Sequence, residues 1–187
     1  MYETNRLILR EWQDKDSEPF VKLNQDPDVM EFFPKLKTKD ETIASITSIK
    51  NGFKEKYFGL YACELKDTHQ FIGFVGLDIP VFEAPFTPCV EIGWRIAKEF
   101  WGQGLAVEAA HKCFEIGFNI FNLDEIVSFT AIPNKKSERV MQKLGMNHNE
   151  GENFYHPNLH NEHTLSLHVL YRLTKAKWMM QNEQRIL

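Results

Sequence analysis

The turn Trp101-Gly102-Gln103-Gly104-Leu105-Ala106 has the composition of an anion-binding site. It comes after an apolar segment expected to be a strand, and it precedes a helical pattern in which Ala106, Ala109 and Ala110 share one face. Glycines at such a junction allow successive backbone N–H groups to converge on one anion, and the N-terminus of the helix adds a partial positive charge. A pyrophosphate group suits this chemistry. The alternative interpretation is a tight turn between a strand and a helix.

Two common nucleotide-binding patterns do not fit this turn. A dinucleotide fold requires G-x-G-x-x-G, and Val107 occupies the position of the third glycine. The phosphate-binding pattern G-x-x-x-x-G-K-[ST] does not occur in the sequence. A nucleotide-dependent oxidoreductase and a nucleotide hydrolase are therefore disfavoured.

The periodicity of apolar residues predicts the elements that position the turn. We expect strands near residues 6–12, 57–65, 71–79, 89–96, 125–131, 154–155 and 168–173. Helices are expected near residues 18–23, 38–53, 106–117 and 134–144, with Asp14 or Asp16 as the cap of the first and Gly145 after the last. This order predicts an α+β (α/β) fold in a single domain over 1–187, with a mixed, mostly antiparallel central sheet and helices on both faces.

Composition limits the class of protein. Hydrophobic residues make up 43% of the 187 residues and charged residues 26%, which is typical of a chain that buries a core. The formal net charge of −4 argues against nucleic acid as a partner. The start of the chain is charged where a signal peptide is apolar, and no apolar run approaches the ~20 residues that span a membrane. We therefore expect a cytoplasmic protein without membrane attachment.

Cysteine and histidine residues do not form a recognisable metal-binding pattern. The three cysteines are widely separated, with no C-x-x-C pair. Five histidines crowd the C-terminal region in a spacing that matches no zinc signature: His148, His156, His160, His163 and His168. We expect no metal, and a loop that lines a substrate pocket is the preferred interpretation of this segment.

Several segments together resemble the GNAT acetyltransferase superfamily. Residues 91–96 and 100–109 look like its coenzyme A-binding motif, and residues 134–146 resemble a second signature of the branch that contains the ribosomal-protein N-terminal (alanine/serine) acetyltransferases. Residues 4–10 and 26–34 are similar to the N-terminal pattern of that branch. The likeness covers most of residues 4–146 in the right order and fades after Met146.

This resemblance implies acetyl-CoA as a co-substrate and a splay between the fourth and fifth strands. It implies that backbone groups of the fourth strand hold the pantetheine arm, at Trp94, Arg95 and Ile96. It also implies a pyrophosphate site built from Gly102, Gln103, Gly104, Leu105 and Ala106. Asn134 is expected to reach the pantetheine with its side-chain amide, or to cap the helix that starts after it.

Acetyl transfer to an amine requires a neutral amine, a polarised thioester carbonyl and a protonated leaving thiolate. Ser137, one helical turn beyond Asn134, resembles the family's serine near the sulfur, and its alternative role is a second cap. Glu91 is the candidate base, and its alternative role is an ion pair with Arg95 on the same face of the strand. The expected substrate-binding residues are Phe32, Tyr155 and His156.

The sequence thus predicts an acetyl-CoA-dependent N-acetyltransferase that acts on a small-molecule amine or a protein N-terminus by direct attack. A coenzyme A-binding sensor or interaction domain without catalysis is the alternative, and the presence of both Asn134 and Ser137 favours the enzyme. The identity of the acceptor and the formation of a homodimer are left open at this point.

Overall fold

The computed structural model describes residues 1–186, with side chains through Glu183. The chain divides into two compact units. The first unit consists of Met1–Asp78 and Gly93–Cys113, and the second consists of Ile79–Ile92 and the chain from Phe114 onward. The boundary therefore falls inside one strand, between Ile92 and Gly93. The single domain over 1–187 stays a prediction.

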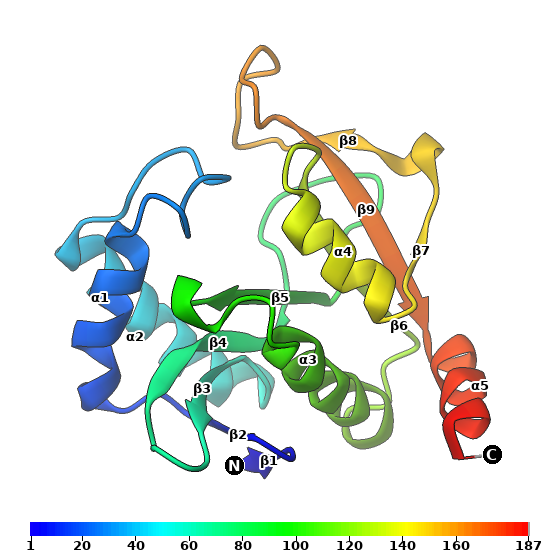
Figure 1. The fold of residues 1–187 in the computed structure, drawn as a ribbon. Helices are drawn as coiled ribbons and strands as arrows, with labels where there is room; N and C mark the ends of the chain where they lie inside the picture. Colours follow the sequence, from blue (N-terminus) through cyan, green and yellow to red (C-terminus); the bar gives the residue numbers. More distant parts are fainter. Residues whose placement is uncertain (187) are drawn as a thin grey trace. The chain divides into compact units, whose positions relative to one another are not determined.

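The first unit contains an antiparallel sheet and three helices (Figure 1). Its strands lie in the order β1-β2-β3-β4-β5, and the first three pairings are antiparallel. The elements are β1 (Tyr2–Glu3), β2 (Leu7–Arg10), α1 (Ser17–Gln25), α2 (Lys39–Lys56), β3 (Leu60–Leu65), β4 (Phe71–Asp78), the larger part of β5 (Glu91–Ile96) and most of α3 (Leu105–Glu115).

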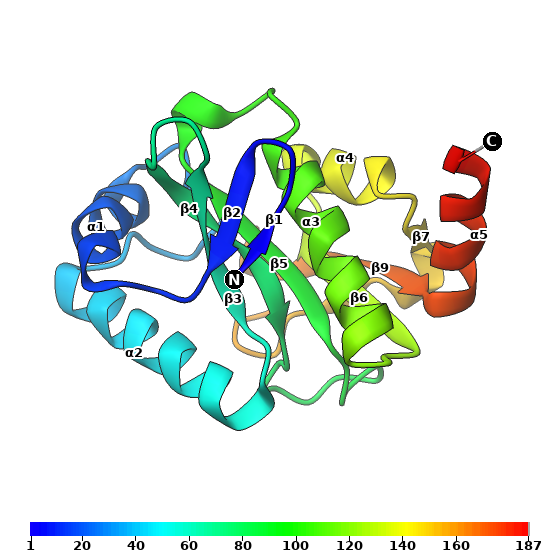
Figure 2. The same cartoon turned by 90° about the horizontal axis from the view of Figure 1, so that it is seen from below.

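Helices cover both faces of this sheet, as predicted. Figure 2 shows α1 and α2 on one face and α3 on the other. The α1/α2 face is packed by an apolar cluster that includes Trp12, Phe20, Ile46 and Phe74. Helix α3 is amphipathic and, within this unit, buries Ala109, Ala110 and Cys113 completely. Burial of these two apolar layers stabilises the unit.

The second unit contains the remaining strands and helices. Strands β6 and β9 pair antiparallel along their lengths, and β7 and β8 each pair with β9. The start of β5 pairs with β6 in parallel, in register at Glu91↔Val127. The elements are β6 (Glu125–Ala131), α4 (Lys135–Lys143), β7 (Asn147–His148), β8 (Phe154–Tyr155), β9 (Leu167–Thr174) and α5 (Lys175–Ile186). An open, mostly antiparallel sheet with a parallel pair confirms the predicted fold class.

Two local predictions need correction. Asp16 does not cap α1 with its side chain; it is fully buried and accepts hydrogen bonds from the Arg10 guanidinium at 2.7 and 2.8 Å. Arg10 also binds the buried carboxylate of Glu64, at 2.7 Å. The strand predicted from residue 57 begins at Leu60, because Tyr57 ends α2 in the left-handed conformation, with φ of 63°.

Strands β4 and β5 approach each other closely at Gly73. This glycine has φ of +134°, a conformation that side-chain-bearing residues rarely adopt. A Cβ atom there would lie 2.1 Å from the carbonyl oxygen of Arg95 and 2.9 Å from the Cα of Ile96. Just beyond the approach, the N–H of Ala97 donates to the carbonyl of Ile72 at 2.8 Å. The second half of β5 can therefore lie this close to β4 only because residue 73 is glycine.

We expect Gly73→Ala to lower the free energy of unfolding by roughly 3 kcal/mol or more, because the new methyl group meets backbone and the φ angle is unfavourable. Gly52→Ala is the matched control, since Gly52 lies in α2 with open space around it. This control should raise stability by about 0.5–1 kcal/mol through helix propensity. Urea denaturation of both variants measures the contrast, and equal stabilities would show that the β4–β5 approach is not a constraint.

Candidate functional site

The turn between β5 and α3 has the backbone conformation that the glycines predict. Gly102 and Gly104 both adopt the left-handed region, with φ of 75° and 76°. Both are exposed, and a Cβ atom added at Gly102 would meet nothing within 4 Å. The space in front of the turn is therefore open to a ligand. The side chain of Trp101 anchors the base of the turn, since its Nε1–H donates to the carbonyl of Ile96 at 2.7 Å.

Helix α3 begins directly after this turn, at Leu105. Its first intrahelical hydrogen bond runs from the N–H of Glu108 to the carbonyl of Gly104, at 3.0 Å. The N–H groups ahead of it, including those of Leu105 and Ala106, lie in the first turn, where a helix offers unused donors and partial positive charge. The local structure therefore suits an anion such as pyrophosphate.

Arg6 and Glu108 hold the turn in place, and the motifs of the sequence assigned no role to either side chain. The Arg6 guanidinium donates to the carbonyl of Gln103 at 3.0 Å and pairs with the Glu108 carboxylate at 2.6 Å. Glu108 also accepts from the hydroxyl of Thr4, at 2.5 Å. A signal was available in the segment Thr4-Asn5-Arg6, which belongs to the N-terminal pattern of the resemblance. Arg6 thus connects the first residues of the chain to the glycine turn.

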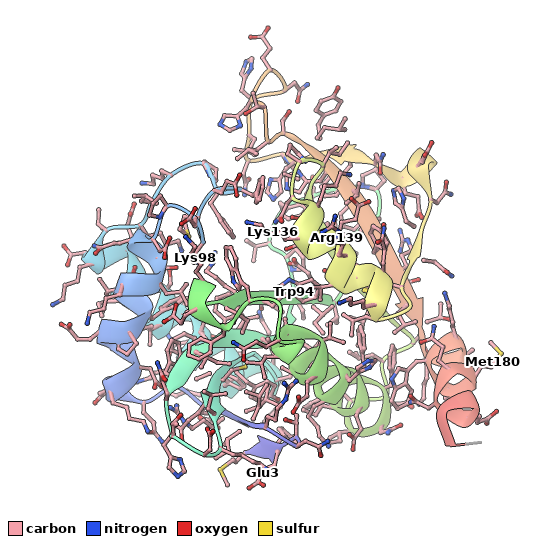
Figure 3. The ribbon with its side chains drawn as sticks, in the orientation of Figure 1. Glu3, Trp94, Lys98, Lys136, Arg139 and Met180 are labelled. Carbon is pink, nitrogen blue, oxygen red and sulfur yellow. The ribbon has the colours of Figure 1, made fainter. Side chains whose placement is uncertain are left out.

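The three predicted pantetheine contacts lie in succession at the end of β5. Ile96 is buried, whereas Trp94 and Arg95 are half-buried. Figure 3 shows Trp94 on β5. The expected contact uses backbone groups of these residues, and it stays a prediction.

The side chain of Arg95 lies on the α1/α2 face of the first unit. Its Nη1 donates to Oδ1 of Asn24 at 2.5 Å, and its guanidinium stacks 4.1 Å from the ring centroid of Phe33 and 5.5 Å from that of Phe74. Its Nε is buried and has no hydrogen-bond partner. Burial lowers the pKa of Arg95 to about 10. Arg95 thus has no carboxylate partner among the described residues. The role of Glu91 stays a prediction.

Asn134 and Ser137 come together at the start of α4. The side-chain oxygen of Asn134 accepts from the N–H of Ser137 at 3.2 Å, which confirms its role as a helix cap. The Asn134 amide donates to the hydroxyls of Thr130 and Ser137, at 2.9 and 3.2 Å. Because Ser137 Oγ accepts this bond, its own O–H proton remains available for donation. Figure 3 shows the exposed residues Lys136 and Arg139 on the same helix.

The other predicted site residues of the second unit lie at β5 and β8. Glu91 is half-buried at the start of β5, Tyr155 is exposed, and His156 is half-buried. The His156 ring lies 4.7 Å from that of Phe82 and 5.0 Å from that of His168. Burial lowers the pKa of His156, and it lowers that of His168 to about 4. Both imidazoles are therefore neutral at pH 7.

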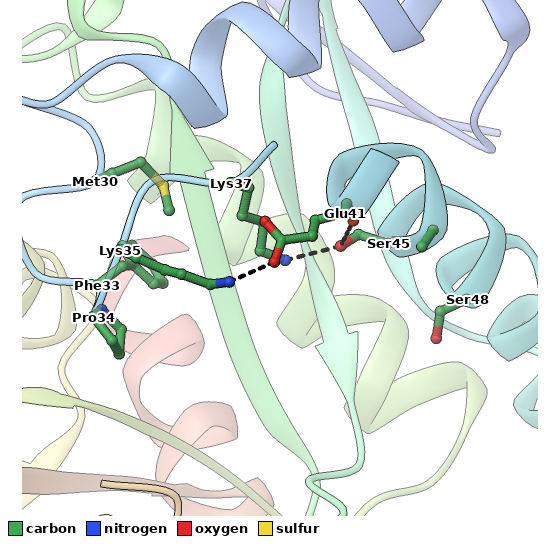
Figure 4. A pocket seen from close by; sticks show the side chains of 9 residues that line it. Met30, Phe33, Pro34, Lys35, Lys37, Glu41, Ser45 and Ser48 are labelled. Carbon is green, nitrogen blue, oxygen red and sulfur yellow. Dashed lines mark hydrogen bonds and ion pairs between the residues drawn. The ribbon is translucent and has the colours of Figure 1, made fainter. Parts of the chain in front are cut away.

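An open pocket of about 530 Å³ lies in the first unit, between the segment after α1 and helix α2 (Figure 4). Phe33 lines it, and the predicted substrate-binding residue Phe32, its neighbour, does not. Polar side chains enter from both sides, at Lys35, Lys37, Glu41, Ser45 and Ser48. The sequence predicted that the acceptor binds near residue 32, but it did not identify the polar side chains that line this pocket.

The described residues offer neither a metal site nor a reactive thiol. No group of three or more His, Cys, Asp or Glu side chains among them is arranged to hold a metal ion. Burial raises the pKa of Cys63 to about 12 and that of Cys89 to about 11, so both thiols are protonated at neutral pH. Across the described helices, none has the length and apolar character needed to cross a membrane.

The chain belongs to the GNAT acetyltransferase family: the model of the acetyltransferase (GNAT) domain matches residues 6–147. The chain is 33% identical over 148 residues to the uncharacterized protein YkkB of Bacillus subtilis, a match that covers 79% of this chain and 85% of YkkB. The resemblance inferred from the sequence motifs is thereby confirmed.

Solved structures show the same fold. A ribosomal-protein-S5-alanine acetyltransferase from Vibrio fischeri matches with a TM-score of 0.74 at 18% identity, covering 95% of this chain and 97% of that one. A spermidine N-acetyltransferase from Vibrio cholerae, in complex with CoA and spermine, matches with a TM-score of 0.70 at 19% identity, covering 92% and 98%. At these identities the likeness concerns the fold.

Proposed function

We propose that this protein transfers an acetyl group from acetyl-CoA to a primary amine, of a small molecule or a protein N-terminus, by direct attack. The observation that carries the proposal is the turn with left-handed Gly102 and Gly104 at the start of α3, in a chain of the GNAT family. A structural neighbour of the same fold is in complex with CoA. The raised pKa values of the cysteine thiols also favour direct attack over a thioester on the enzyme.

Backbone groups of this chain would bind the coenzyme. The N–H groups of Gly102, Gln103, Gly104, Leu105 and Ala106 would hold the pyrophosphate, and the backbone of Trp94, Arg95 and Ile96 the pantetheine, with Asn134 as a further contact. Acetyl-CoA supplies the activated acetyl thioester. A backbone N–H of β5 would polarise the carbonyl.

Two side chains would transfer protons during the reaction, one as a donor and one as an acceptor. Ser137 would donate its hydroxyl proton, or a hydrogen bond, at the position of the leaving thiolate, since its Oγ already accepts from Asn134. Glu91 would accept the proton of the amine, directly or through water. Phe32, Tyr155 and His156 would contact the acceptor. A coenzyme A-binding sensor remains the alternative, and release of free thiol on addition of an amine distinguishes the enzyme from it.

Gly104→Asp tests the coenzyme site. Acetyl-CoA should raise the melting temperature of the wild-type protein, because a ligand that binds the folded state stabilises it by mass action. The carboxylate of the variant would face the pyrophosphate and abolish this shift. Gly104→Asn is the control, because it has the same shape and the same tolerance of positive φ without the charge. Differential scanning fluorimetry provides the measurement, and a full shift in the Asp variant would assign the pyrophosphate elsewhere.

Ser137→Ala tests assistance to the leaving thiolate. We expect kcat to fall by ~10²-fold or somewhat less, with little change in acetyl-CoA affinity. Thr130→Val is the structural control, because Thr130 accepts the other hydrogen bond of the Asn134 amide. If both variants lose the same small fraction of activity, the role of Ser137 is limited to stabilising the start of α4.

Glu91→Gln tests the general base. It should reduce kcat/KM by roughly 10- to 100-fold at pH 7 and by less at high pH, where the free amine becomes abundant, since amine pKa values are ~8–10.4. Glu99→Gln, at an exposed position, controls for the loss of one negative charge. The measurement is kcat/KM as a function of pH for both variants. A reduction of kcat/KM that is uniform across pH would exclude Glu91 as the base.

A further inference from the structure

Lys37 has different surroundings from the two lysines next to it in the sequence. The side chains of Lys35 and Lys39 are 71% and 65% exposed, and each forms an ion pair with a glutamate. Lys37 is half-buried, and its Nζ donates to the neutral hydroxyl of Ser45 at 2.8 Å. A hydroxyl stabilises an ammonium less than a carboxylate does. The charged form of Lys37 is therefore held by a weaker contact than that of its neighbours.

Ser45 orients the Lys37 amine without using its lone pair. The O–H of Ser45 donates to the backbone carbonyl of Glu41 at 2.8 Å, so toward Lys37 the same oxygen acts as an acceptor (Figure 4). A neutral amine can therefore keep its hydrogen bond to Ser45 through an N–H, and its lone pair points elsewhere. Attack on a carbonyl group requires this lone pair.

Three charged side chains act on Lys37, and their effects differ in sign. Burial is the largest cause that lowers the pKa of Lys37, and the positive charges of Arg95 and Lys35 lower it further. The negative charge of Glu41 raises the pKa, but the net change is a decrease. At neutral pH a larger fraction of Lys37 is therefore uncharged than of a lysine in water. Desolvation and nearby cations are the usual means by which proteins make a lysine nucleophilic.

The pocket of Figure 4 gives small molecules access to this amine. It is open, with a volume of about 530 Å³, and Lys37 is one of the residues that line it. Met30, Phe33 and Pro34 line it from the segment after α1 and offer apolar contacts. An acetyl group combines an apolar methyl with an electrophilic carbonyl. An acetyl thioester therefore suits a pocket in which apolar side chains lie beside a nucleophilic amine.

We propose that Lys37 is a modification site whose side-chain amine is acylated by thioesters, acetyl-CoA among them. In this step Nζ bonds to the carbonyl carbon, the carbon–sulfur bond breaks, and the amine releases a proton to solvent as the thiolate departs. The products are an Nε-acyl lysine, which is neutral, and a free thiol. This reaction needs no amine acceptor, so it does not depend on the proposed acetyl transfer.

Peptide mapping by mass spectrometry tests the proposal on the intact protein. Cleavage after glutamate releases residues 32–41 as one peptide, which contains Lys35, Lys37 and Lys39. The protein is treated with acetyl-CoA or with S-acetyl-N-acetylcysteamine, a thioester without a nucleotide. We expect acetylation of Lys37 to be at least about threefold faster than that of either neighbour. Exposure alone would favour Lys35 and Lys39, and faster reaction at these two with both thioesters overturns the proposal.

Ser45→Asp and Ser45→Asn form a matched pair of variants. The aspartate would place a carboxylate beside Nζ and favour the ammonium, so the preference for Lys37 should be lost. The asparagine has the same shape and offers a neutral oxygen as acceptor, so the preference should remain. A preference that survives Ser45→Asp would show that the surroundings of Lys37 do not control its reactivity. The comparison of the three lysines in the wild-type protein decides the matter if the Asp variant does not fold.

The two thioesters and the variant Gly104→Asp identify the source of the acetyl group. Equal acetylation of Lys37 by acetyl-CoA in the wild-type and Gly104→Asp proteins assigns the reaction to thioester from solution. Loss of the reaction in Gly104→Asp assigns it to coenzyme bound at the glycine turn. Both results support Lys37 as the site. If Lys37 is acetylated while no added amine is, the proposed function fails and the modification site stands.

Discussion

The contact on which the first unit depends is the close approach of β4 to β5 at Gly73. Only a residue without a side chain leaves room for the Arg95 carbonyl and the Ile96 backbone, and the Ala97–Ile72 hydrogen bond extends the contact. Because this approach places the end of β5, it also places the Arg95 side chain and the segment that leads to α3. The Arg95 side chain lies against Asn24, and the chain continues through Trp101 into the glycine turn.

The backbone and the side chains of strand β5 therefore have different roles. Its backbone, through Trp94–Ile96, is the part proposed to hold the coenzyme, and it leads to the turn that opens α3. Its Arg95 side chain donates to the buried side chain of Asn24 and stacks on the ring of Phe33. A single strand thus offers backbone groups to the proposed coenzyme site while its Arg95 side chain packs against α1 through Asn24.

Local features of the fold could be predicted closely where one physical rule dominated. Residues 125–131 are rich in β-branched and aromatic side chains and alternate apolar and polar from Val127 onward, and they form β6 with those bounds. Thr38 and Glu41 form the capping box of α2, at the start of a segment whose helical spacing was predictable. The prediction failed at the start of α1, where a tertiary contact overrode the local rule. The Asp16 carboxylate accepts from the buried Arg10 guanidinium and from the N–H of Gln13, and it does not cap α1.

The sequence by itself determined the glycine turn, its position before a helix and the family of the chain, because these depend on residues adjacent in the sequence. Only the tertiary structure decided which distant side chains meet: Arg6 at the turn, Asn24 at Arg95, and Lys37 at Ser45. It also decided that Phe33 rather than Phe32 lines the pocket, since neighbouring residues point in different directions. Spacing predicts local geometry, whereas contacts between residues far apart in the sequence form only when the chain has folded.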